Sequence, residues 1–261
     1  MKKSGMFSAI LIIVAMVAAV VVYYFVLGNP NNFANPEKTI AKEGNYFGIV
    51  YLGGFVVIPL LCLLIMVSTY TIERILSLSR AKGKGAIEVF LKNIQLRLRE
   101  GDIEGSIALC DSQKGSIANI LKQGLETYQT LSLDKAMDAE TKLEEVKNAI
   151  EEAMGLELPL LNRNLSALAT IASVSVLFGL FGTVLGMIRS FAALAKAGSP
   201  DATKLSMGIS EALINTAFGL GGAIIGSISY NFFLTKVGSI TYMIDEATYN
   251  LISILAIKSK S

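Results

Sequence analysis

The chain has 261 residues, of which 52% are hydrophobic and 17% are charged, whereas about 25% of the residues of an ordinary soluble domain are charged. A net charge of +2 lacks the strongly basic surface of a nucleic-acid-binding domain, so we expect no nucleic-acid partner. The absence of histidine excludes Ser-His and Cys-His nucleophiles and the commonest metal ligand. Cys62 and Cys110 stand 48 residues apart and indicate neither a disulfide nor a metal site. We expect a membrane protein that is not an enzyme and binds no cofactor.

Four stretches with few charges are long enough to cross a bilayer, which takes about 20 apolar residues in a helix. They cover residues 6–27, 44–72, 164–188 and 205–234. The first also fits a secretory signal, but its roughly 22 apolar residues exceed the usual signal length of about 7–15, so we expect a retained anchor. The sequence predicts an all-α integral membrane protein with four transmembrane helices and a helical cytoplasmic domain between the second and third.

These spans divide the chain into segments. Residues 1–43 are predicted to form an anchor helix and a short outer segment, 44–72 the second transmembrane helix, and 73–163 the cytoplasmic domain. Residues 164–235 form a helix pair with a short outer loop, and 236–261 a cytoplasmic C-terminal tail. Basic residues gather at the ends placed inside the cell: Lys2, Lys3, Arg74, Arg80, Lys82 and Lys84. Because cytoplasmic flanks carry the excess of basic residues, we expect both termini in the cytoplasm.

The segment 73–163 holds 28 of the 44 charged residues of the chain. Apolar residues at helical spacing predict a helix that ends before Gly101, and Asp102 is expected to begin a short helix through Cys110. A further helix is expected over residues 116–129. No strand pattern competes, so this segment is predicted to be a water-facing group of helices.

A longer helix is predicted to begin at Ser132 as its N-cap, with an apolar stripe of Leu143, Val146, Ile150 and Met154. Its many charges are most simply a solvated face, the alternative being a subunit or partner contact. Pro159 predicts a kink or break where this helix approaches the third span. The triplet Gly83-Lys84-Gly85 lacks the preceding strand and the spacing of a phosphate-binding loop, so we expect no nucleotide site.

The third span contains closely spaced glycines. Gly182 and Gly186 are four residues apart, the spacing at which small residues let two membrane helices approach closely. Thr183 lies between them. Its hydroxyl either bonds to the backbone one turn earlier or contributes to a polar path.

Glu211 is the only charged residue between positions 205 and 234. A charged group at the bilayer centre costs about 2.5–3.5 kcal/mol, so it normally faces other helices or water. The alternative is that Glu211 lies near the outer surface and reaches the headgroups. Thr216 is about 140° from Glu211 around the helix, so the two residues cannot line the same wall. The face of Glu211 continues through Asn215 and the glycines Gly208, Gly219, Gly222 and Gly226, and residues 199–201 (Ser-Pro-Asp) are predicted to begin the helix.

Together the two segments resemble the signature of the MotA/TolQ/ExbB proton channel family, which pairs a GTVxGM-containing segment with a following GIxEALxTTAxGL-like segment. Here they are residues 177–187 and 208–220. The resemblance implies that Thr183 and Thr216 line an ion path and that Glu211 is the acidic group beside it. It implies packing or pore-adjacent positions for Gly179, Gly182, Gly186, Asn215, Gly219 and Asn231. The chain departs from the family at Val176 and Ile225, where relatives commonly have proline, and in having an additional first span.

The Ser-Glu-Ala-Leu context of Glu211 resembles the ExbB/TolQ branch. For that branch the resemblance implies a homopentamer in the bacterial inner membrane that encloses an ExbD-like subunit. Such a stator uses the proton-motive force to energise a TonB-like protein for outer-membrane transport. A TolQ-like stator for envelope constriction and a MotA-like stator for motility are the alternatives within the family.

Two other classes of function stay open from the residues alone. A secondary transporter of a small solute often shows an internal repeat, and no convincing duplication relates the two halves of this sequence. A membrane scaffold without conductance leaves Glu211 unexplained. Because Glu and Thr offer no cage of backbone carbonyls, we expect protons rather than sodium as the coupling ion.

Overall fold

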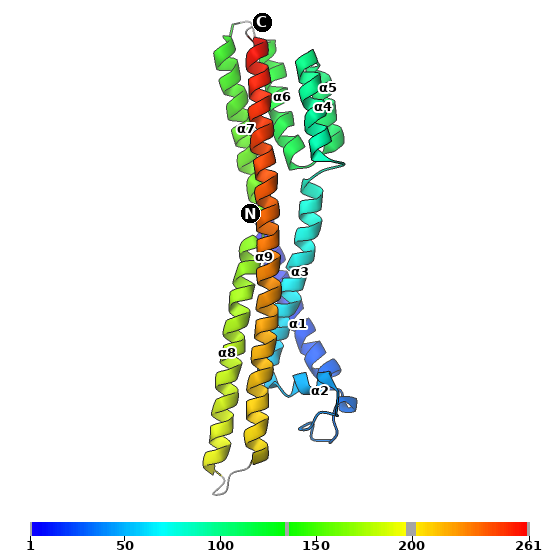
Figure 1. The fold of residues 1–261 in the computed structure, drawn as a ribbon, viewed down its shortest axis with the longest axis vertical. Coiled ribbons are helices and arrows are strands. Elements are labelled where there is room, and N and C mark those ends of the chain that lie inside the picture. The colour runs from blue at the N-terminus through cyan, green and yellow to red at the C-terminus, as the bar shows by residue number, and fades with distance from the viewer. Residues whose placement is uncertain (1, 134–135, 197–201, 260–261) are drawn as a thin grey trace. The chain divides into compact units, whose positions relative to one another are not determined.

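The computed structural model describes residues 2–133, 136–196 and 202–259 (Figure 1). These residues are mostly helical and contain no β-strand; the one pairing of extended backbone among them is an isolated bridge between Phe33 and Ala41. The chain forms two compact units. The apolar unit comprises residues 1–72 and 166–231, and the charged unit comprises residues 73–165 and 232–261.

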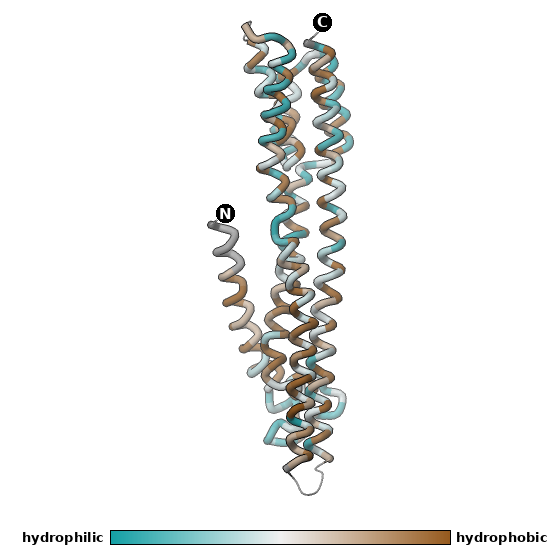
Figure 2. The backbone as a smooth tube through the Cα atoms, turned by 90° about the vertical axis from the view of Figure 1, so that its left-hand side faces the viewer, coloured by the Kyte–Doolittle hydropathy of each residue, from teal (hydrophilic) through white to brown (hydrophobic). Residues whose placement is uncertain are grey.

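Four helical stretches are long and apolar enough to cross a membrane, which confirms the predicted all-α fold with four spans. They lie within Ala9–Leu27, Gly54–Ala81, Ala139–Ala195 and Ala202–Lys258. Figure 2 shows apolar residues gathered along the first helix and along the last two helices within the apolar unit, whereas the helices of the charged unit alternate polar and apolar residues. Such alternation is typical of amphipathic helices, which bury one face and expose the other to water.

The apolar unit begins with α1 (Lys2–Val21), which passes directly into the π-helical segment η1 (Val22–Leu27). The short turns that follow are η2 (Pro30–Asn32), α2 (Tyr46–Tyr51) and η3 (Gly54–Val56). The long helices are α3 (Val57–Ala81), α8 (Leu165–Lys196) and α9 (Ala202–Ser259), and both α3 and α9 contribute residues to both units. The predicted N-cap of α9 in residues 199–201 lies outside the described residues.

The second span differs from the predicted range of 44–72 in its bounds. The short helix α2 precedes it, and α3 begins at Val57 and continues to Ala81. The two helices are separated because Gly54 has φ +74°, a left-handed conformation that glycine adopts without steric cost. This turn brings the backbone of Gly53 and Gly54 against α9, as described below.

The segment between η1 and α2 is fixed by aromatic and amide contacts. The ring of Tyr23 stacks on Tyr51 with 4.7 Å between ring centroids. Asn32 donates from Nδ2 to the carbonyl oxygens of Val26 and Leu27 at 2.7 and 2.9 Å. These carbonyls end η1 and have no partner within it, so Asn32 satisfies the end of the first membrane helix.

The charged unit contains α4 (Ile87–Glu100), α5 (Ile103–Gln113), α6 (Ser116–Ser132) and α7 (Ala139–Leu161). As predicted, Gly101 ends α4, with φ +88°, and Asp102 caps α5 by accepting a 2.8 Å hydrogen bond from the backbone of Gly105. A Cβ at Gly124 of α6 would lie 2.6 Å from Ile150 of α7. The two helices therefore pack with almost no gap.

The predicted start of α7 at Ser132 is wrong. Ser132 is the last residue of α6, and its hydroxyl donates back to the Gln129 carbonyl at 2.7 Å. The cap of α7 is Asp138, whose carboxylate accepts from the backbone of Thr141 at 3.1 Å. Ser132 therefore belongs to the preceding helix and lies too far along the chain from Ala139 to cap α7.

The predicted break near Pro159 lies slightly after it. Pro159 is inside α7, which ends at Leu161, and α8 begins at Leu165. Between them Asn164 has φ +61°, which no helix residue adopts. The chain therefore breaks at residues 162–164, just after Pro159, and not at the proline itself.

Residues 236–261 are not the simple tail that the sequence analysis expected, because α9 continues through them to Ser259. Buried apolar residues recur every three or four positions along this part of the helix: Phe233, Val237, Ile240, Ile244, Ala247, Leu251 and Leu255. This spacing gives a continuous apolar stripe, which packs within the charged unit.

Candidate ion pathway

The helices α8 and α9 approach each other through glycines on both sides. A Cβ at Gly219 would lie 2.7 Å from the Cα of Gly179, and one at Gly186 would lie 2.7 Å from the carbonyl oxygen of Gly208. A Cβ at Gly182 would lie 2.4 Å from the Cβ of Asn215. Each position therefore excludes any larger side chain, and the predicted packing positions other than Asn231 lie in one interface.

Thr183 of α8 and Thr216 of α9 meet at this interface, where their hydroxyl groups contact each other directly. Thr183 also donates to the carbonyl of Gly179, one turn earlier, at 3.1 Å. Both threonines are half-buried. The helix pair thus joins two hydroxyl groups that are 33 residues apart in the sequence.

Glu211 lies apart from the threonine pair and forms an ion pair with Arg189 of α8. Glu211 is only 8% exposed, so its carboxylate lies inside the protein rather than at its surface. The guanidinium of Arg189 also lies over the ring of Phe55, 5.5 Å from its centre. Arg189 directly follows the predicted third span of residues 164–188, and no local pattern in the sequence assigned it a role. The signal that could have found it is that Arg189 lies one turn beyond Gly186, on the face that approaches α9.

Asn215, one turn beyond Glu211, is completely buried. Its Nδ2 donates to the carbonyl oxygen of Gly53 at 2.9 Å, while its Oδ1 has no hydrogen-bond partner among the described residues. Glu211 and Asn215 therefore use the same face of α9 to meet the turn that precedes α3.

Comparison with known proteins identifies the family. Residues 112–246 match the model of the MotA/TolQ/ExbB proton channel family. The chain belongs to this family. The match includes Thr183, Glu211 and Thr216, and the family comprises proton-channel proteins rather than enzymes. Together with the four apolar helices, it indicates a multi-pass inner-membrane protein.

Individual relatives come from the ExbB and TolQ groups. An ExbB-like biopolymer transport protein of Synechocystis is 34% identical over 184 residues, which cover 69% of this chain and 81% of that protein. The Tol-Pal system protein TolQ of Pseudomonas aeruginosa is 36% identical over 120 residues, 46% of this chain and 52% of TolQ. ExbB of Salmonella typhimurium is 29% identical over 167 residues, 59% of this chain and 66% of ExbB. The chain thus matches about half the length of this TolQ.

Two positions, Val176 and Ile225, distinguish this member of the MotA/TolQ/ExbB family from the pattern described above. The helices α8 and α9 continue without a break through Val176 and Ile225, as expected where proline is absent. Asn231 is exposed, and its Nδ2 donates to the Ser227 carbonyl of its own helix at 2.9 Å. Asn231 lines a separate cavity of about 290 Å³ and is not part of the threonine pair.

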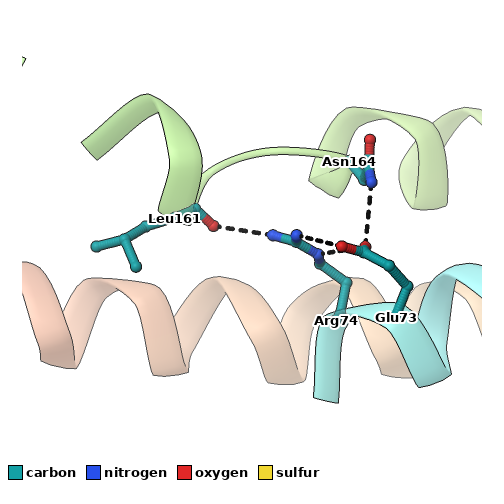
Figure 3. Close-up of polar contacts among 4 residues, drawn as sticks. All are labelled: Glu73, Arg74, Leu161 and Asn164. Atoms are coloured by element: carbon teal, nitrogen blue, oxygen red, sulfur yellow. Dashed lines mark hydrogen bonds and ion pairs between the residues drawn. The ribbon is translucent and has the colours of Figure 1, made fainter. Parts of the chain in front are cut away.

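A second charged cluster lies in the charged unit, where α7 ends (Figure 3). Arg74 of α3 has no exposed surface and donates two hydrogen bonds of 2.9 Å to the carboxylate of Glu73. Its third hydrogen bond, of 3.2 Å, goes to the carbonyl of Leu161, and Asn164 donates to Glu73 at 3.0 Å. In the sequence, Arg74 stands out only as one of the basic residues that indicate membrane orientation. Contacts between residues about 90 positions apart leave no local sequence pattern.

Proposed function

We propose that this chain is the ExbB-like subunit of an inner-membrane motor driven by the proton-motive force. In this proposal it forms a homopentameric stator around an ExbD-like subunit, and both of its termini lie in the cytoplasm. The complex energises a TonB-like protein for transport across the outer membrane. Membership in the family and the ExbB relatives support this assignment.

The contact between the hydroxyl groups of Thr183 and Thr216 carries the proposal. Hydroxyl groups both donate and accept hydrogen bonds, so adjacent hydroxyls in an apolar helix pair offer a polar route for a proton. Glu211 lies on α9, five residues before Thr216, and contributes a negative charge that is paired with Arg189. The chain has no histidine, so its proton handling depends on carboxylate and hydroxyl groups together with an acid of the partner.

The energy available fits contacts of this kind. One charge that crosses about 100 mV releases about 2.3 kcal/mol, which is comparable to one or two hydrogen bonds in a protein. A single proton can therefore reset a local contact between the stator and its partner.

The test is energised uptake in cells that lack their own ExbB and TolQ and carry this chain with its ExbD-like partner. We expect Thr183→Val and Thr216→Val to reduce uptake of a labelled iron chelate at least about tenfold, because each removes a hydroxyl while keeping the shape of the side chain. Thr170→Val is the matched control, since Thr170 is an exposed threonine of α8 that also bonds one turn back, to Ser166. Uptake at the wild-type rate by both pathway variants would refute the assignment.

A TolQ-like role is the second candidate, because the P. aeruginosa TolQ is 36% identical over the matched region. The two roles differ in the partner. Rescue of detergent resistance together with a TolR-like protein, without rescue of iron-chelate uptake, would place the chain in the TolQ group.

A further inference from the structure

Arg189 and Glu211 are part of a larger contact that joins three segments of the apolar unit. Glu211 of α9 pairs with Arg189 of α8, and the Arg189 guanidinium covers the ring of Phe55. A Cβ at Gly54 would lie 2.6 Å from Oε1 of Glu211. The backbone of the turn 53–55 therefore lies directly against the ion pair.

Asn215 adds an independent contact to the same turn. It is fully buried and donates to the Gly53 carbonyl at 2.9 Å. Two successive turns of α9 are thus bound to one short segment before α3. Thr216 contacts Thr183 instead. The face of α9 that carries Thr216 is therefore separate from the face through which Glu211 and Asn215 contact the turn 53–55.

The arginine also limits what Glu211 can do. A guanidinium keeps its charge throughout the physiological pH range, and it makes strong charge-assisted hydrogen bonds with a carboxylate. The side chain of Glu211 is 11% exposed, whereas that of Arg189 is 51% exposed. The carboxylate is therefore enclosed and oriented by a cation on the neighbouring helix, which fixes where its charge lies.

We propose that Arg189 is a positioning residue that holds Glu211 as the fixed half of an electrostatic latch, and that this latch closes the ends of α8 and α9 onto the turn 53–55. The latch comprises Arg189, Glu211, Asn215 and residues 53–55. The expected effect of the latch on energised uptake rests on the proposed function. The contact between its residues does not depend on that function. In this proposal Glu211 acts through its ion pair with Arg189, and Thr183 and Thr216 alone form the polar route.

The contact itself is tested by thermal unfolding of the full chain in detergent micelles, which requires neither a partner nor a proton gradient. We expect Arg189→Gln and Glu211→Gln each to lower the melting midpoint by about 5 °C. The double variant should melt no lower than the single variants, because the first substitution already removes the shared interaction. Glu43→Gln, at an exposed position of the segment before α2, is the matched control and should melt like the wild type. Wild-type melting of Arg189→Gln, or additive losses in the double variant, would overturn the latch.

Energised uptake then separates a latch from proton transfer. We expect Arg189→Gln to lose as much uptake as Glu211→Gln, and Arg189→Lys, which keeps the charge, to restore part of it. The exchanged pair Arg189→Glu with Glu211→Arg should recover uptake above either single reversal. Full uptake by Arg189→Gln beside an inactive Glu211→Gln would show that the carboxylate acts on its own, and would overturn the proposed role of Arg189.

If the exchanged pair does not fold, Arg189→Gln and Glu211→Gln still test the latch, because they introduce no new charge. Failure of the proposed function has a different signature. Normal uptake by Thr183→Val and Thr216→Val would refute the threonine route, while the melting experiment would still report on the latch.

Discussion

Arg74 is a charged side chain without exposed surface, and its hydrogen bonds explain how the fold accommodates it. Two of them bind the carboxylate of Glu73, and the third reaches the carbonyl of Leu161, the last residue of α7. The final carbonyls of a helix have no partner within it and carry partial negative charge. Arg74 therefore completes the end of α7 from another helix, and Glu73 is fixed in turn by Asn164.

Replacement of Arg74 by alanine should be strongly destabilising. We expect Arg74→Ala to lower the free energy of unfolding by about 3–5 kcal/mol, because it leaves the Glu73 carboxylate half-buried without its cation. Arg97→Ala is the control, since Arg97 and Asp102 form an ion pair in which both side chains are 44% exposed, and it should cost less than about 1 kcal/mol. Denaturant unfolding of the two variants measures the difference, and equal losses would contradict this account of Arg74.

Cys110 is a second buried residue, and the pKa of its thiol determines how fast it reacts. Burial raises the pKa of its thiol to about 12, with a smaller contribution from the charge of Asp111. Because only the thiolate is nucleophilic and the pKa is raised, the reactive form becomes abundant only as the pH approaches 12.

We therefore expect Cys110 to react at least about 100-fold more slowly with an aromatic disulfide reagent at pH 8 in the folded protein than after denaturation. Absorbance of the released thiol, measured in a Cys62→Ala background, reports on Cys110 alone. Ser132→Cys places an exposed thiol in the same unit and should react rapidly in the folded state. Equal rates before and after denaturation would show that Cys110 is accessible.

At the scale of elements, the contact between α8 and α9 depends on shape rather than on strong interactions. Gly179 and Gly219 bring the two backbones together, and Gly182 accommodates the side chain of Asn215. Membrane helices gain little from hydrophobic burial against each other, so close packing and interhelical hydrogen bonds take its place. The same close approach allows the short side chains of Thr183 and Thr216 to touch.

A single methyl group at this interface should therefore be costly. We expect Gly182→Ala to lower the free energy of unfolding by about 1–3 kcal/mol and to reduce energised uptake, because its Cβ would displace Asn215. Gly221→Ala is the matched control, since a Cβ there would meet no atom within 4 Å. Thermal unfolding and energised uptake are measured for both variants. Wild-type stability and uptake of Gly182→Ala would show that the two helices can separate enough to hold a methyl group.

The second half of α9 shows how an element can serve two environments. Its residues beyond Phe232 belong to the charged unit, where buried residues such as Ile244 and Leu251 lie on one face. Tyr242 and Tyr249 are exposed. The helix is continuous, but in this part only one of its faces is apolar and buried.

For the whole molecule, the distribution of charge is the property that determines membrane topology. Charged residues concentrate in the segment 73–163, and the short segments on the other side of the predicted spans carry few basic residues. From the positive-inside rule we propose that both termini and the charged unit lie in the cytoplasm.

Labelling from outside the cell tests this orientation. In a chain without native cysteines, we expect Glu43→Cys to react with a membrane-impermeant maleimide in cells whose outer membrane has been permeabilised. Ser132→Cys should react only after the inner membrane is broken, because residue 132 is predicted to be cytoplasmic. The reverse pattern would invert the proposed topology.

Much of the fold could be predicted because its causes are local. Gly101 and Asp102 end one helix and begin the next through backbone conformation and capping, which are properties of neighbouring residues. The start of α7 was predicted wrongly because Ser132 and Asp138 are both good caps, and hydrogen bonds to Gln129 and Thr141 decide between them. The stripe on residues 236–261 has helical spacing in the sequence, but spacing alone does not show which elements it packs against.

The sequence by itself determined the four apolar helices through hydropathy. Local spacing and a family signature also singled out Thr183, Thr216 and Glu211, whose role stays a prediction. Only the tertiary structure decided which side chains meet. It joined Arg189 to Glu211, Asn215 to Gly53 and Arg74 to Leu161. Such pairs depend on how helices pack across long separations in the chain, and a charge or an amide has no periodic pattern that reveals its distant partner.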